Sequence, residues 1–224
     1  MPETQTSTPL LPRERLIRYG AAALEDAELL AIMLRTGTAN TPVLSLARQL
    51  LQGFGGLRQL LAADRAALAA IPGLGPAKSC QLVATMELAR RSCAEALQDD
   101  NVMQQPEAVA RYCAAHLAHL RIEHCIALYL DNRLRLLACR TLSQGTTNQA
   151  SVYVGEVVRS ALAHHASAMI LAHNHPSGSL EPSQADIELT RKAKAALALV
   201  DIKLVDHLII AGNASCSLAA LGLC

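Results

Sequence analysis

Residues 172–186 read AHNHPSGSLEPSQAD, and the short apolar run AMIL at residues 168–171 leads into them. Two histidines at alternating positions of an extended backbone, His173 and His175, point their imidazoles to the same side. A proline and a glycine then turn the chain. The serine three residues before Asp186 favours the start of a helix whose first turn carries that carboxylate. The stretch is therefore a plausible site for one metal ion, with two nitrogens, one carboxylate oxygen and a fourth position for water.

Each of these residues also has a purely structural interpretation. Ser183 and Asp186 match the Ser-x-x-Asp capping box that a helix start uses in many proteins. A single histidine after a strand is usually only a polar residue at a sheet edge. The combination of His-x-His-Pro, a glycine turn and Ser-x-x-Asp favours metal binding, and Ser183 can cap the helix and still offer its hydroxyl to a reaction intermediate.

Length and composition restrict the possible classes of protein. The 224 residues, half of them apolar, allow one large domain or two small ones. Four Tyr, one Phe and no Trp predict a core of Leu, Ala, Val and Ile, and they argue against a surface that stacks nucleic-acid bases. The net charge is +1, with ten basic and eight acidic residues in 1–98 and ten and eleven in 99–224. Neither half is therefore a strong electrostatic attractor of nucleic acid.

Cysteine usage and the chain start bear on the cellular compartment. Seven scattered cysteines without a Cys-x-x-Cys pair do not form a disulfide framework or a cysteine-zinc knuckle, and they suit a reducing cytosol. The N-terminus is polar, without a basic-then-apolar signal, and no apolar run reaches the roughly 18 residues that span a membrane. We expect a cytoplasmic protein with no membrane segment.

The first half of the chain shows helical patterns and no strand pattern. Helices are expected over residues 13–19, 25–35, 42–52, 57–61, 64–70 and 77–93. A polar stretch around residue 100 precedes Pro106, where a helix restarts. The sequence therefore predicts a small all-α domain over residues 1–100 and a second domain over residues 101–224.

One connection in this half, IPGLGPAK at residues 71–78, resembles the helix-hairpin-helix element, which binds the DNA backbone without reading sequence. Gly73 and Gly75 have no Cβ, so backbone N–H groups can approach a phosphate at the start of the next helix, helped by Lys78 and the Ser79 hydroxyl. The alternative is a tight turn between helices that needs glycine for its geometry alone. The weak basicity supports that alternative, but the motif in its helical context favours phosphate binding, which we expect to be weak.

The second half interleaves strands and helices. Strands are expected over residues 125–130, 134–142, 168–172, 202–205 and 208–210, with helices over 107–120, 157–165 and 183–199. A polar loop is expected over 143–150, followed by a short extended stretch over 151–154. This alternation predicts an α/β or α+β domain with a mixed sheet. The histidine stretch follows one of the strands, where sites are commonly found.

The histidine stretch resembles the JAMM metalloprotease motif of the MPN domain family, His-x-His-Pro followed by Ser-x-x-Asp. The chain is more closely similar to the bacterial RadC-like proteins, in which the motif reads His-Asn-His-Pro-Ser-Gly. The similarity covers nearly the whole chain, including the glycine hairpin, LRTG at residues 34–37, LARQLL at 46–51 and DHLII at 206–210. It implies an MPN-like mixed sheet with flanking helices, preceded by a helix-hairpin-helix domain. It also implies one Zn²⁺ per chain, held by His173, His175 and Asp186.

Hydrolysis also needs a glutamate that activates water. Spacing alone leaves two candidates, Glu123 before the first expected strand and Glu156 at the head of a helix. Each could also be an ordinary strand-edge or helix-dipole carboxylate. The resemblance points to Glu123, because Glu-His-x-x-x-Leu-x-Leu-Asp is the RadC-like form of the glutamate strand.

The chain departs from the family pattern at two places. It has Val154-Gly155-Glu156 where Pro-Arg-Glu is common, and Ser179 where an acidic residue is common. No expected ligand is affected, so these departures concern substrate handling more than metal binding. His207 is a candidate for a residue that contacts one of the metal ligands without binding the metal itself.

The resemblance implies a zinc-dependent hydrolase that cleaves a peptide or isopeptide bond, with Ser183 as hydrogen-bond donor to the tetrahedral oxyanion. The RadC name carries a DNA-repair label, so the helical half would place the hydrolase on DNA. The alternatives are a DNA-associated adaptor with a structural or vestigial metal site, and a metal-dependent nuclease, for which two-metal clusters are more usual. A zinc deaminase is disfavoured, since His-x-Glu and Pro-Cys-x-x-Cys are absent. The sequence indicates neither the substrate nor the oligomeric state.

Overall fold

The structure is a computed structural model that describes residues 10–145, 152–212 and 214–224. The chain divides into two compact units, Met1–Glu87 and Leu88–Cys224. The division between the units falls within helix α6 (Pro76–Asp99). The sequence instead predicts a domain boundary at the end of this helix, near residue 100. That the two parts are separate domains with a boundary at residue 100 stays a prediction.

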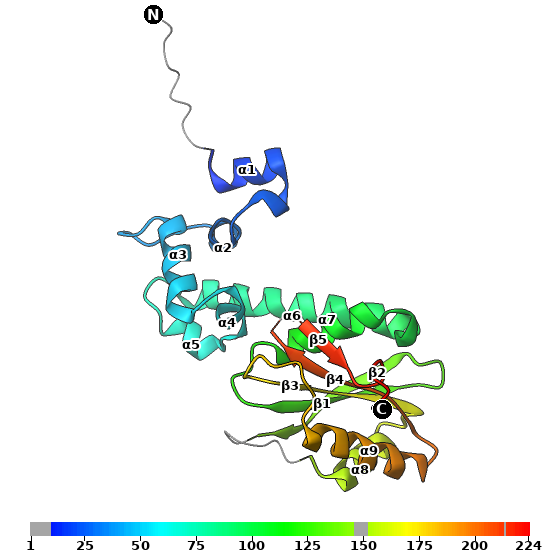
Figure 1. The fold of residues 1–224 in the computed structure, drawn as a ribbon. Helices are drawn as coiled ribbons and strands as arrows, with labels where there is room; N and C mark the ends of the chain where they lie inside the picture. Colours follow the sequence, from blue (N-terminus) through cyan, green and yellow to red (C-terminus); the bar gives the residue numbers. More distant parts are fainter. Residues whose placement is uncertain (1–9, 146–151, 213) are drawn as a thin grey trace, which may run out of the picture. The chain divides into compact units, whose positions relative to one another are not determined.

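Every regular element in the described residues of the first unit is a helix, as predicted (Figure 1). Its core consists of buried aliphatic side chains, among them Leu30, Leu50 and Leu60. Local signals define the helix ends: Glu28 caps the backbone N–H of Glu25 at the start of α2, and the left-handed Gly55 ends α3. The elements before α6 are α1 (Pro12–Tyr19), η1 (Ala21–Ala23), α2 (Asp26–Leu34), α3 (Val43–Phe54), α4 (Leu57–Ala62) and α5 (Arg65–Ala69).

Helix α6 is longer than predicted. The sequence indicates an end at Cys93, after a basic pair, but the helix continues to Asp99. Leu97 is fully buried in the core of the second unit, and no glycine or proline interrupts residues 94–99. Burial of an apolar side chain therefore outweighs the weak stop signal of the basic pair.

The second unit is built on a five-stranded mixed sheet in the order β2-β1-β3-β4-β5. The β3–β4 pair is parallel and the other neighbours are antiparallel. The fold class predicted from the sequence, a mixed sheet with flanking helices, is confirmed. The strands are β1 (His124–Leu130), β2 (Leu136–Gln144), β3 (Ala168–Asn174), β4 (Lys203–Ala211) and β5 (Ala214–Ser217).

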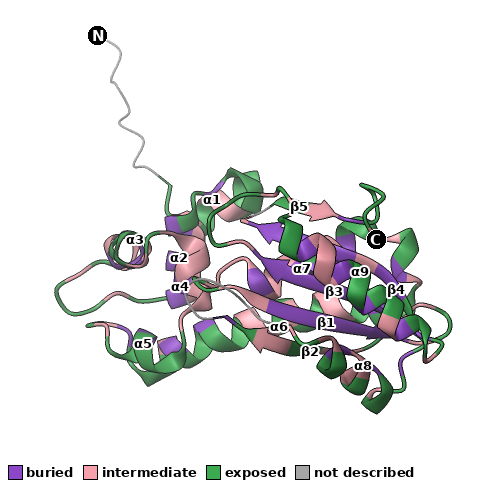
Figure 2. Ribbon diagram, turned by 60° about the horizontal axis from the view of Figure 1, so that its bottom comes forward, coloured by how far each residue is buried: buried purple, intermediate pink, exposed green. Residues whose placement is uncertain are grey.

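Helices cover both faces of this sheet (Figure 1). On one face, Ile126 and Ile170 pack with side chains of α7 (Pro106–Leu117). On the other, Tyr129 and Leu171 pack with side chains of α8 (Val154–Ala163) and α9 (Gln184–Ala198). Because both faces are covered, β1 and β3 are buried almost along their whole length (Figure 2). His173 follows Leu171 by two residues, so it lies on the α8 and α9 face at the end of β3.

The prediction for the last strands was wrong in one respect. The sequence indicates two short strands separated by Asp206 and His207, but β4 runs through both residues without a break. Asp206 accepts hydrogen bonds from the Ser217 hydroxyl and from backbone N–H groups of His207 and Ala219. Polar groups satisfied in this way do not interrupt a strand.

Smaller differences lie around the expected polar loop. Its first two residues, Ser143 and Gln144, belong to β2, and residues 146–150 lie outside the described part of the chain. Val154, expected to be extended, begins helix α8. Within the described residues, none of the helices combines the length and apolar character that crossing a membrane requires.

Candidate metal centre

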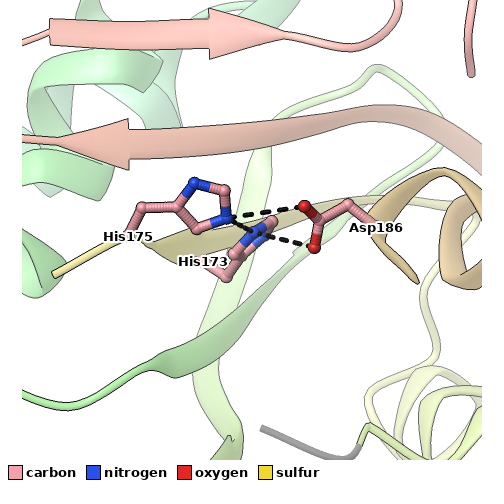
Figure 3. Close-up of side chains that lie close together, drawn as sticks. All are labelled: His173, His175 and Asp186. Carbon is pink, nitrogen blue, oxygen red and sulfur yellow. Dashed lines mark hydrogen bonds and ion pairs between the residues drawn. The ribbon is translucent and has the colours of Figure 1, made fainter. Parts of the chain in front are cut away.

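Three side chains gather where β3 ends and α9 begins (Figure 3). The Nε2 atom of His173 lies 2.9 Å from Nε2 of His175 and 3.1 Å from Oδ1 of Asp186. His175 Nε2 lies 3.4 Å from Asp186 Oδ2. This is the one group of three or more His, Cys, Asp or Glu side chains within the described residues that could share an ion. The structure thus brings together the three ligands predicted from the sequence.

The spacing of these atoms suits a tetrahedral metal ion. Zinc bonds of about 2.0–2.1 Å at tetrahedral angles put neighbouring ligand atoms about 3.3 Å apart. The observed separations of 2.9, 3.1 and 3.4 Å need to change by only a few tenths of an ångström. His173 and Asp186 are buried, whereas the His175 side chain keeps 15% of its surface exposed. The group is therefore accessible from the side of His175.

The start of helix α9 fixes the position of Asp186. Ser183 is the N-cap residue, and its hydroxyl accepts the backbone N–H of Asp186 at 3.2 Å. The Asp186 carboxylate in turn accepts the backbone N–H of Ser183 at 2.8 Å and the Ser183 hydroxyl at 2.7 Å. The predicted capping box is present and also turns the carboxylate toward the histidines.

The surroundings of Asp186 favour its ionised form. Burial alone would raise the pKa of this carboxyl group, but the interactions with His173 and the hydrogen bonds from Ser183 outweigh it. The pKa of Asp186 is therefore held well below its ordinary value. An ionised carboxylate is the form that binds a metal cation.

The orientation of His175 is set by a backbone carbonyl. Its Nδ1 lies 2.9 Å from the carbonyl oxygen of Ser179. Since a carbonyl only accepts, Nδ1 carries the hydrogen, and Nε2 of the neutral ring presents its lone pair to Asp186 and His173. Ser179, which departs from the family pattern, thus acts here through its backbone.

His207 lies directly behind His173, as considered from the sequence. Its Nε2 is 2.9 Å from His173 Nδ1, and its side chain is fully buried. Burial, with the neighbouring His173 adding to it, lowers the pKa of His207 to about 3. His207 is therefore a neutral imidazole at physiological pH and can accept a hydrogen bond.

Glu123 is the residue immediately before β1, the strand that neighbours β3. Cys125 pairs with His173 across the β1–β3 ladder, and Glu123 precedes Cys125 by two residues. Burial raises the pKa of the Cys125 thiol to about 12, and the carboxylates of Glu123 and Asp186 both add to the rise. Both carboxylates therefore lie near the Cys125 thiol, but Glu123 is not part of the group formed by His173, His175 and Asp186.

Asn174, between the two histidines, holds the segment that carries Glu123. Its Oδ1 accepts the backbone N–H of His124 at 2.8 Å, and its Nδ2 donates to the carbonyls of Leu120 and Ile122 at 3.2 and 3.0 Å. These contacts lie on both sides of Glu123 in the sequence. Asn174 therefore fixes the path of this segment relative to β3.

Glu156, the other glutamate considered, is differently placed. It lies in the first turn of α8 with 52% of its side chain exposed, and it forms an ion pair with Arg159. The ion pair lowers the pKa of Glu156. A carboxylate held by a surface arginine is a poorer candidate for a general base than Glu123, which lies near the thiol of Cys125, the residue opposite His173.

The glycine hairpin belongs to the first unit, and its side chains are used internally. Lys78 Nζ donates to the carbonyls of Gly37 and Gly73 at 2.9 and 3.2 Å, and the buried Ser79 hydroxyl bonds to carbonyls of its own chain segment. A Cβ on Gly73 would lie 2.5 Å from Thr38 Cγ2. These contacts agree with the structural alternative. DNA contact by Gly73, Gly75 and Lys78 stays a prediction.

Two residues near the site were not singled out from the sequence. Asn174 stands between the two histidines, and Thr190 follows Asp186 by four residues, one helical turn. The first position is visible in the motif itself. The spacing of Thr190 from an expected ligand is a signal that could have indicated a supporting role.

A mixed sheet covered on both faces, with His-x-His at a strand end and an aspartate at the next helix start, agrees with the JAB or MPN-type domain that the sequence resembles. Residues 103–223 match the family model of the RadC-like JAB domain, and residues 5–80 match that of the UPF0758 N-terminal region. The chain therefore belongs to the RadC-like, UPF0758 family.

Curated relatives extend over nearly the full chain. A UPF0758 protein of Bordetella parapertussis is 54% identical over 94% of both chains. UPF0758 proteins of Azotobacter vinelandii and of Acidovorax sp. are 53% and 50% identical over 94% and 95% of both chains. Their names describe no activity.

Proposed function

We propose that this chain is a zinc-dependent hydrolase of the JAMM metallopeptidase type, acting on a peptide or isopeptide bond. The observation that carries the proposal is the convergence of His173, His175 and Asp186 at the end of β3. Two imidazole nitrogens and one carboxylate oxygen form a ligand set of catalytic zinc sites, which keep a fourth position free. The RadC-like JAB domain match supports a hydrolytic family.

A zinc ion bound there would polarise the substrate carbonyl and lower the pKa of a water molecule to about 7. The protein must still remove a proton from the attacking water and deliver one to the leaving amine. Glu123 fits this role because its carboxylate, like that of Asp186, lies near the thiol of Cys125, the residue that pairs with His173 in the sheet. Asn174 keeps its segment in place through contacts with Ile122 and His124.

Ser183 has a second role in this proposal. In the structure its hydroxyl donates to Asp186 Oδ2 and accepts the Asp186 backbone N–H. Rotation of the hydroxyl hydrogen away from Asp186 would let it donate to a developing oxyanion, while the acceptor contact that caps the helix stays intact. Donors of this kind contribute about 2.7–4 kcal/mol in comparable sites.

The proposal is tested with zinc-loaded wild type, Glu123→Gln and Glu156→Gln on a peptide library and on isopeptide-linked substrates, with cleavage read by mass spectrometry. Wild type and Glu156→Gln should cleave. Glu123→Gln should lose about 10²–10⁴-fold in rate because general-base catalysis is removed, while it binds zinc as before.

Three results would contradict the proposal or a part of it. Full activity of Glu123→Gln would remove this glutamate from the mechanism. Zinc-loaded wild type that cleaves none of these substrates would favour an adaptor with a structural metal. Metal-dependent cleavage of DNA in the same preparations, sensitive to Asp186→Asn, would favour the nuclease alternative.

A further inference from the structure

A continuous string of buried hydrogen bonds runs behind the candidate ligand His173. Its Nδ1 contacts His207 Nε2 at 2.9 Å, and His207 Nδ1 contacts the Thr190 hydroxyl at 2.6 Å. The Thr190 hydroxyl also bonds to the carbonyl oxygen of Asp186 at 2.6 Å. His207 and Thr190 have no exposed surface. The string, which we call the relay, therefore joins β3, β4 and α9. Its two inner residues, His207 and Thr190, have no contact with solvent.

Each hydrogen in this string can be assigned by counting donors. The Asp186 carbonyl can only accept, so the single hydroxyl hydrogen of Thr190 goes to it. The Thr190 oxygen must then accept from His207, so His207 Nδ1 carries a hydrogen. The neutral His207 ring has a lone pair on Nε2, which accepts from His173 Nδ1–H. His173 Nε2 is thereby left with its lone pair, facing Asp186.

We propose that His207 and Thr190 are positioning residues that hold His173 in the single tautomer able to bind a metal through Nε2. This inference rests on the proposed function only in that it concerns the same metal group. It extends that function to two residues that touch neither metal nor substrate. Metal-binding histidines generally donate their second ring hydrogen to a partner that fixes their orientation. Here the partner is a neutral histidine, itself fixed by a threonine.

The same assignment of hydrogens explains why the group of His173, His175 and Asp186 needs a cation. His175 Nδ1–H is engaged by the Ser179 carbonyl, so both Nε2 atoms present lone pairs at a separation of 2.9 Å. The Asp186 carboxylate adds negative charge beside them. Two lone pairs and a carboxylate repel one another unless a positive charge lies between them. The relay thus prepares a site that is complete only with a metal ion or an added proton.

The test uses pairs of variants that keep or remove one hydrogen-bonding atom. The Gln side chain can place an acceptor where His207 has Nε2, so His207→Gln keeps the acceptor and His207→Leu removes it. Thr190→Ser keeps the hydroxyl and Thr190→Val removes it with little change of shape. Ser160→Ala is the matched control, since Ser160 lies on α8 and its hydroxyl contacts Tyr129 of β1, outside the relay.

Two quantities are measured: Zn²⁺ affinity by competition with a chromophoric chelator, and the His173 tautomer in the metal-free protein by ¹⁵N NMR. His207→Leu should lose about 10–100-fold in affinity, as is typical when such partners are removed. Thr190→Val should show a mixture of His173 tautomers and a smaller loss. The Gln, Ser and control variants should stay within a few fold of wild type.

Wild-type affinity in both His207→Leu and Thr190→Val, or equal losses in His207→Leu and His207→Gln, would overturn the proposal. If His207→Leu fails to fold, the Thr190 pair decides it. If wild type binds no zinc, the proposed function fails. The metal-free spectrum still decides the relay, because the relay requires wild-type His173 to carry its hydrogen on Nδ1.

Discussion

Neighbouring residues at the end of β3 point to opposite sides of the strand and have different roles. His173 faces the metal group, while Asn174 faces away and is 2% exposed. The three side-chain hydrogen bonds of Asn174 go to the backbone of residues 120–124, the segment that carries Glu123. One motif, His-Asn-His, therefore supplies ligands and also holds the segment of the proposed base.

Replacement of Asn174 should therefore be costly. Asn174→Ala removes three hydrogen bonds of about 0.5–1.5 kcal/mol each, so the unfolding free energy should fall by about 2–4 kcal/mol. Urea denaturation measures this change. The same substitution at the exposed Asn132 should have little effect. Equal stability of the two variants would show that the Asn174 contacts do not hold the segment.

At the scale of elements, helix α9 depends on its first residues for both stability and site geometry. Ser183→Ala removes the N-cap acceptor for the Asp186 N–H and should cost about 0.5–2 kcal/mol of unfolding free energy. Ser183→Thr, which keeps a hydroxyl, should cost less. Thermal unfolding of the three proteins measures the difference. An Ala variant as stable as wild type would contradict the capping role.

The glycine hairpin before α6 allows packing and DNA contact to be separated. Gly73 has a φ of +93° and lies against Thr38, so Gly73→Ala should destabilise the first unit by about 1–2 kcal/mol or more. Nothing lies within 4 Å of an added Cβ at Gly75, so Gly75→Ala should leave stability nearly unchanged.

The DNA prediction for this hairpin is tested by titrating duplex DNA at low salt with wild type and Gly75→Ala. If the backbone at this turn approaches a phosphate, Gly75→Ala should weaken binding while folding is intact. Identical binding curves would leave the glycines with a role in turn geometry alone.

The sequence predicts elements well where local signals and burial agree. The capping residues at Ser183 and Asp186 and the alternation of His173 and His175 are local, so the gathering of the metal group could be predicted. The His173–His207 and Thr190–His207 contacts join residues 34 and 17 positions apart, so spacing alone cannot reveal them. The unbroken β4 was missed for the same reason, because Asp206 is satisfied by Ser217 and Ala219 on a later segment.

At the scale of the whole molecule, the reactivity of each cysteine thiol depends on whether it is buried in a core. Cys113 and Cys125 are buried in the second unit, and Cys80 is exposed in the first. Burial raises the pKa of Cys125 to about 12 and that of Cys113 well above its usual range. Raising the pH from about 7 to 9 should therefore speed alkylation of exposed thiols and leave these two unreacted.

Mass spectrometry of alkylated peptides checks this expectation. Cys80 should be labelled in the native protein, and Cys113 and Cys125 only after denaturation. Rapid labelling of Cys113 in native protein would show that the core between α7 and the sheet opens easily.

The central claim is that His173, His175 and Asp186 hold one metal ion in the second unit. Zinc titration of the metal-free protein against a chromophoric chelator tests it most directly, with Asp186→Asn and the matched change Asp201→Asn at an exposed position. Wild type and Asp201→Asn should bind one zinc ion per chain with the same affinity. Asp186→Asn should lose at least about 100-fold, since loss of a ligand exceeds loss of a supporting partner. Absence of zinc binding in wild type, or equal affinity in Asp186→Asn, would contradict the claim.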